Sequence, residues 1–166
     1  MKYAAWPDID ALSRGNLSPD TPAEGSYGLN EFAMYLTAAD LAKCGLSPDE
    51  GHTLEYYWGT PNVKGAAYIP MVADCMWAGG FPYTDNTPPA TENDISLGGN
   101  EIRRFCIDRH NGGYINMAFD DGHVQRSALK QLWSWKWSKQ WADQLPLTPN
   151  WSTEAPWMVR LPEKFD

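Results

Sequence analysis

The sequence lacks any run of about 18 consecutive apolar residues, the length that a membrane-spanning helix requires. Its first 30 residues contain no basic segment followed by an apolar one, which is the pattern of a secretory signal peptide. Basic residues are scarce, since 13 Lys and Arg against 21 Asp and Glu give a net charge of −8. Nucleic acids and anionic membranes attract basic faces, so this charge argues against either as a partner.

Cysteine is also sparse and widely spaced. Cys44, Cys75 and Cys106 form no CxxC pair, which disfavours a structural zinc site. An odd number of thiols allows at most one internal disulfide, and the three positions alone leave its partners open.

Aromatic residues are abundant, with nine Trp, eight Tyr and five Phe in 166 residues. Disordered chains are poor in aromatics, so this composition predicts a folded protein. The length fits a single domain over residues 1–166. We expect an irregular arm over 1–26 and an extended, Pro-rich tail over 143–166, because Pro and Gly interrupt every periodic pattern there.

Between these ends the patterns predict an α+β fold: a small antiparallel sheet with short helices and long loops. β-propensity favours strands over 52–58, 66–73 and 114–119, with a short further strand from His123. Pro70 suggests an edge position or a bulge in its strand. Helices are expected over 27–36, 37–44 and 128–142, the last because Trp133, Trp137 and Trp141 fall four residues apart.

Long loops separate these elements. Residues 78–100 are polar and rich in Gly and Pro, and a loop of that length is usually functional or mobile. Asn111-Gly112-Gly113 is a hairpin signal, and Asp120-Asp121-Gly122 is a turn in which glycine supplies a positive φ.

Metal ligation is one candidate chemistry. His110 and His123 flank the strand over 114–119, and a straight strand would separate them by roughly 20 Å, so turn roles are favoured over a shared metal. A metal enzyme that also uses His52 is a weaker alternative. Oxygen-rich loops suit Ca²⁺ better, and the candidates are Asp120, Asp121, Asp85 and Asp94. No other cofactor is indicated, and no nucleophile–base pattern stands out, so an enzyme is less expected than a binding or structural protein.

The tryptophans suggest a second class of function. Exposed indoles stack on sugar rings, and Trp58 and Trp77 lie at loop edges. Together with Asp74 and Asp85 they would form a glycan-binding or glycan-processing surface. The helical spacing of Trp133, Trp137 and Trp141 favours core positions for those three residues.

The segment FCIDRHNGGYINMAFDDGHVQRSALKQLWSWKW carries the most specific pattern in the chain. It resembles the C-terminal signature of prepilin-like proteins related to type II secretion pseudopilins, in which a His is followed by nine residues and Asp-Gly. Ten residues separate His110 from Asp121 here, so the chain departs from that spacing by one. The matching signature residues are Arg109, His110, Asn116, Asp121 and Gly122.

This resemblance implies a pseudopilin-like globular head without the N-terminal membrane-anchoring helix of the family. It implies a non-enzymatic, extracytoplasmic role (periplasmic, cell-surface or secreted) in a secretion or surface filament. The partners would be other pilin-like subunits or secretion components, reached through protein–protein contacts. Because family members are exported, it also makes a Cys75–Cys106 disulfide reasonable. A charge-assisted bond between Arg109 and Asp121 is expected across the hairpin.

Overall fold

The computed structural model describes residues 27–46, 52–60, 63–92 and 99–165, and its fold is α+β. The sheet has five strands in the order β3-β1-β2-β4-β5. All neighbouring strands are antiparallel except β1 and β3, so the sheet is mixed rather than purely antiparallel. The strands are β1 Tyr27–Asn30, β2 Pro70–Asp74, β3 Gly79–Gly80, β4 Tyr114–Phe119 and β5 Val124–Ala128.

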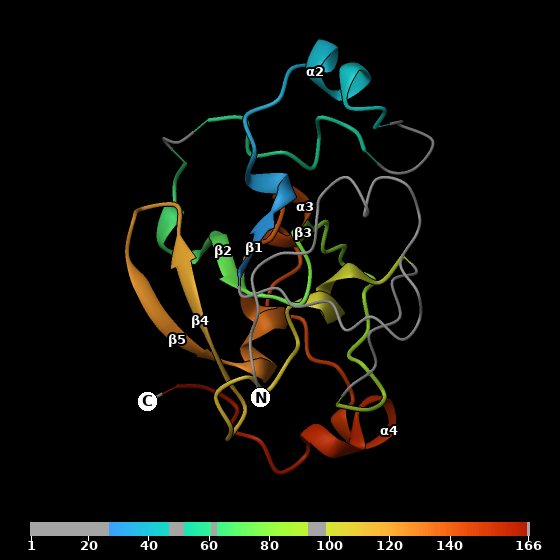
Figure 1. The fold of residues 1–166 in the computed structure, drawn as a ribbon, viewed down its shortest axis with the longest axis vertical. Helices are drawn as coiled ribbons and strands as arrows, with labels where there is room; N and C mark the ends of the chain where they lie inside the picture. Colours follow the sequence, from blue (N-terminus) through green and yellow to red (C-terminus); the bar gives the residue numbers. More distant parts are fainter. Residues whose placement is uncertain (1–26, 47–51, 61–62, 93–98, 166) are drawn as a thin grey trace.

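The helices are short, and α2 and α4 lie at opposite ends of the long axis of the molecule (Figure 1). They are α2 Ala38–Lys43, α3 Lys139–Ala142 and α4 Trp151–Glu154. The 3-10 turns are Glu31–Ala33, Ala66–Tyr68, Glu101–Arg104, Leu129–Ser134 and Pro156–Met158.

The helix predicted over 37–44 is confirmed as α2. Thr37 caps its first turn, with the Thr37 hydroxyl and the Asp40 carboxylate each accepting a backbone N–H of the other residue. The helix predicted over 27–36 is wrong, because this segment is β1 followed by a 3-10 turn. The side chain of Asn30 caps this 3-10 turn by accepting the N–H of Phe32.

The strand predicted over 114–119 is confirmed as β4, and β5 returns beside it to form a hairpin. Asn111-Gly112-Gly113 does not make the hairpin turn. These residues lie before β4 with φ values of 54°, 95° and 82°, and the Asp108 carboxylate accepts the N–H groups of Gly112 and Gly113. Pro70 opens a central strand, not an edge strand, and the register shifts beside it as expected for a bulge.

The single helix predicted over 128–142 is wrong. A 3-10 turn ends at Ser134, the backbone is extended at Trp135 and Ser138, and α3 begins only at Lys139. The strand predicted over 52–58 is also wrong, because that segment forms turns and irregular backbone. Aromatic residues make these segments attractive for a strand or helix, but here their side chains fill the core.

The main core lies under the inner face of the sheet. It combines inward residues of β4 with the tryptophans that follow β5; its largest buried members are Trp133, Trp137, Trp141, Phe105, Ile115 and Met117. A second cluster joins Phe32, Leu41, Tyr57 and Phe81. The core prediction for the three spaced tryptophans is therefore confirmed, although they do not share one helix.

The long loop and the C-terminal tail both contact the core. The indole N–H groups of Trp133, Trp141 and Trp157 donate to carbonyls of Asn86, Pro82 and Pro89 in the long loop. The tail over 143–165 contains α4 and a 3-10 turn, and its apolar residues pack against the main core. Lys130, only 5% exposed, bonds Glu163 there. The arm over 1–26 lies outside the described residues.

Candidate functional site

Three of the five signature residues converge on Asp74, the last residue of β2: Arg109, His110 and Asn116. Asp74 is 1% exposed, and its Oδ2 lies 2.8 Å from Nε2 of His110 and accepts the backbone N–H of Asn116 at 2.7 Å. Nη1 of Arg109 lies 3.6 Å from Oδ1, while Nη2 donates to the carbonyl of Cys75. Hydrogen-bond donors and a cation therefore surround this buried carboxylate, which is the arrangement that makes burial of a charge tolerable.

The other half of the signature forms a separate cluster at the hairpin tip. Oδ1 of Asp121 lies 2.5 Å from Nδ1 of His123, and hydrogen bonds from the backbone and the ring of His123 lower the pKa of Asp121. The expected bond between Arg109 and Asp121 is wrong, because each has a different partner. Gly122 has φ 87° and supplies the turn as expected.

The calcium candidates are not gathered into one site. Asp120 accepts the hydroxyl of Tyr35 at 3.1 Å, and Asp85 accepts a bond from its neighbour Asn86. Among the described residues, no three His, Cys, Asp or Glu side chains are placed to hold a metal ion. Asp94 lies outside the described residues, so calcium binding stays a prediction.

The outer face of the sheet carries a feature that the sequence reasoning missed. The strand registers place Leu29, Val72, Ala118 and Val124 opposite one another in a continuous apolar row across four strands. Leu29 is 48% exposed and Val124 is 70% exposed. The strand sequence YINMAF could have indicated this row, because successive side chains of a strand point to opposite faces. Ala118 therefore points outward while Met117 and Phe119 point inward.

A polar row runs beside the apolar one on the same outer face. Tyr27 lies opposite Asp74, whose carboxylate bonds Asn116, and Asn116 lies opposite Arg126. The ring of His110 is held over this row through its bond to Asp74. The signature cluster therefore forms one border of the apolar row, and we call the two rows together the outer face.

Two hollows lie along the outer face. One, of about 310 Å³, is lined by Tyr27, Val72, Asn116, Met117, Ala118 and Val124. The other, of about 300 Å³, is lined by Leu29, Asn30, Ala33, Met34, Tyr35 and Met71. The apolar row lies between polar side chains on one side and methionine and tyrosine side chains on the other.

The tryptophans proposed as sugar platforms occupy different environments. Trp58 is 7% exposed and its indole N–H donates to the carbonyl of Trp137, so the prediction of an exposed platform is wrong for this residue. Trp77 is half-buried against the main core, and the guanidinium of Arg104 lies 5.8 Å from its ring centre. Asp74 is enclosed by the signature residues and is not available to a sugar.

All three cysteines are free thiols in the structure. Cys75 and Cys106 are buried separately rather than joined as a disulfide: the Sγ of Cys75 accepts the N–H of Trp77, and the Sγ of Cys106 contacts the sulfur of Met158. Burial raises the pKa of Cys75 to about 12 and raises that of Cys106 as well.

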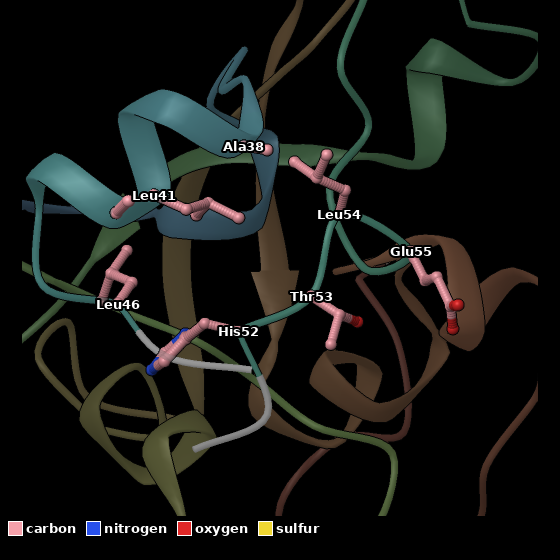
Figure 2. A pocket seen from close by; sticks show the side chains of 8 residues that line it. Ala38, Leu41, Leu46, His52, Thr53, Leu54 and Glu55 are labelled. Atoms are coloured by element: carbon pink, nitrogen blue, oxygen red, sulfur yellow. The ribbon is translucent and has the colours of Figure 1, made fainter. Parts of the chain in front are cut away.

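A further hollow of about 400 Å³ lies between α2 and residues 52–55 (Figure 2). Figure 2 shows Leu41, Leu46 and Leu54 around it. Within the described ranges, the buried atoms Nδ1 of His52 and Oγ1 of Thr53 have no hydrogen-bond partner. The rest of the lining is mostly apolar, with the exposed acid Glu55 among its members.

In the described part of the chain, no helix has both the length and the apolar character needed to cross a membrane. The geometry thus presents an apolar sheet face bordered by the signature cluster. No family model, curated protein or solved structure matches the chain.

Proposed function

We propose that this chain is the head of a pilin-like protein that works outside the cytoplasm in a secretion or surface filament. Its role is structural, and the outer face receives an apolar helix of a pilin-like subunit. The observation that carries the proposal is the row of Leu29, Val72, Ala118 and Val124 beside the signature residues.

An antiparallel sheet with one face on the core normally turns polar side chains outward. Here the central row of the outer face is apolar in all four strands, and contiguous apolar surface of this kind marks an interaction site. Covering one exposed valine or leucine side chain completely contributes about 1.5–3 kcal/mol. Even partial covering of Leu29 and Val124 therefore favours association.

The shape of the face suits a helix. Neighbouring strands lie about 4.8 Å apart and a helix with its side chains is about 10 Å wide, so one helix covers two to three strands. The small side chain of Ala118 leaves room for such a helix between Val72 and Val124 on the neighbouring strands. The hollows on this face would accept its larger side chains.

The alternative of a glycan-binding surface loses support. It relied on Trp58, which is in the core, and on Asp74, which the signature residues enclose. Trp77 and Asp85 are the two members of the original set that are not buried.

Site-specific photocrosslinking in the native host tests the proposal. A benzophenone amino acid at Val124 should crosslink to a pilin-like subunit identified by mass spectrometry, and Val72→Lys should remove that crosslink without lowering the thermal midpoint by more than a few degrees. The control position is Val159, which is also exposed but lines neither hollow. Equal capture from Val159, or capture that never includes a pilin-like subunit, would overturn the proposal.

A further inference from the structure

The edge strand β3 has the fewest residues of any strand in the sheet. Gly79 and Gly80 pair in parallel with Leu29 and Asn30, and the N–H of Leu29 donates to the carbonyl of Ala78 at 3.0 Å. A two-residue edge strand has few backbone bonds of its own, so side chains must supply much of what holds it.

Two charged side chains of the 3-10 turn Glu101–Arg104 hold β3. Nη1 of Arg104 donates to the carbonyl of Gly79 at 3.0 Å, and Nη2 lies 2.6 Å from the carboxylate of Glu101. The other oxygen of Glu101 accepts the N–H of Phe81 at 2.7 Å. This ion pair thus bonds the two backbone groups on either side of Gly80, which are the carbonyl of Gly79 and the N–H of Phe81.

A third charged side chain, Glu31, lies directly on β3. Its Oε1 is 2.7 Å from the position that a Cβ on Gly79 would occupy, so only glycine fits beneath it. The ion pair of Arg104 goes to Glu101, and in the described part of the chain Glu31 makes no ion pair. One guanidinium therefore faces two carboxylates.

This imbalance makes the cluster sensitive to protonation. Burial, and then the charge of Glu101, raise the pKa of Glu31 to about 6 against the opposing effect of Arg104. Tyr57 also senses Glu31, but burial is the main cause that raises the pKa of Tyr57, so Tyr57 is neutral throughout this range. A group whose pKa is raised in the folded state favours that state when protonated, and this contribution is lost as the pH rises through 6.

We propose that Glu31, Glu101 and Arg104 form an acid-stabilised latch that holds β3 against β1 and releases it as the surroundings become neutral. At mildly acidic pH, neutral Glu31 lies beside the Glu101–Arg104 pair without repulsion. At neutral pH, ionised Glu31 repels Glu101, and β3 together with the segment that follows it opens more often. The latch is independent of the function of the outer face.

Amide hydrogen exchange, corrected for the intrinsic effect of pH, tests the latch. The opening of Gly80 and Phe81 should rise roughly tenfold between pH 4.5 and pH 7.5, with a midpoint near 6. Glu31→Gln keeps the shape of the side chain and should make the opening independent of pH at these two amides. Glu55→Gln is the matched control, because Glu55 is an exposed acid at the hollow beside α2. This substitution should leave the pH dependence of the opening unchanged.

Amides of β4 supply an internal reference, because they should show no such midpoint. The latch would be overturned if Gly80 and Phe81 open equally at both pH values in the natural chain. It would also be overturned if Glu31→Gln shows the same midpoint as the natural chain.

Discussion

Oδ2 of Asp74 and Nε2 of His110 lie 2.8 Å apart, although 36 positions separate these residues in the sequence. Nδ2 of Asn116 lies 2.9 Å from the same ring nitrogen, so this edge of the histidine ring contacts both side chains. The signature histidine thus fixes a loop to the sheet.

Removing the acceptor of this cluster should destabilise the fold strongly. Asp74→Ala removes the buried carboxylate that lies 3.6 Å from Nη1 of Arg109 and leaves the N–H of Asn116 without this acceptor. We expect a loss of about 3 kcal/mol in the free energy of unfolding, measured by urea denaturation. His110→Ala should cost about 1 kcal/mol, because it removes one donor and leaves Asp74 its other two partners.

Asp121→Ala is the matched control for Asp74→Ala. Asp121 is an exposed acid that also bonds a histidine, so its loss should leave the free energy of unfolding nearly unchanged. Equal losses at the two positions would contradict the central role of Asp74.

The two faces of β4 and β5 should respond differently to the same substitution. Val124→Ser is on the outer face and should change stability by less than about 0.5 kcal/mol, because the side chain is mostly exposed. Met117→Ser places a polar group in the main core and should cost about 3 kcal/mol or more. Thermal unfolding followed by circular dichroism checks both, and a large loss at Val124 would contradict the exposed apolar row.

The link between Trp133 and the long loop predicts a local effect. Trp133→Phe keeps an aromatic ring in the core but leaves the carbonyl of Asn86 without its indole donor. We expect a loss of about 1–2 kcal/mol, together with faster hydrogen exchange at residues near 86. Trp137→Phe is a suitable comparison, because Trp137 is also buried but its indole donates to the carbonyl of Leu132, outside the loop; the same rise in exchange near 86 in that variant would argue against the link.

Thiol chemistry separates the free cysteines from a disulfide. In the native protein, Cys44 should react rapidly with a disulfide reagent, because it is exposed while Cys75 and Cys106 are buried with raised pKa values. Three thiols per chain should react after denaturation without reductant. A count of one under those conditions, with Cys44 still reactive in the native protein, would show that Cys75 and Cys106 form a disulfide.

Local signals in the sequence predicted some elements well. The capping pattern of Thr37 and Asp40 specifies α2 within four residues, and the alternation in YINMAF specifies β4, because both depend on neighbours in the chain. The convergence of Arg109, His110 and Asn116 on Asp74 could not be predicted in this way. The signature marked three of these residues as important but not the buried acid that joins them.

The failed predictions have a common physical cause. Trp133, Trp137 and Trp141 repeat at the spacing of a helix, but the indole N–H groups of Trp133 and Trp141 bond carbonyls of Asn86 and Pro82, which are distant in the sequence. These tertiary bonds outweigh the local preference for a helix. The aromatic run at Tyr56, Tyr57 and Trp58 was misread as a strand for the same reason, since its rings pack into two different clusters.

The three indole bonds to the long loop also restrict how that loop can change over evolution. Their acceptors are the carbonyls of Pro82, Asn86 and Pro89, which are four and three residues apart. Inserting or deleting one residue between these positions would move a carbonyl away from its indole. Natural relatives of this chain should therefore differ by substitutions between positions 82 and 89, and by changes of length only outside them.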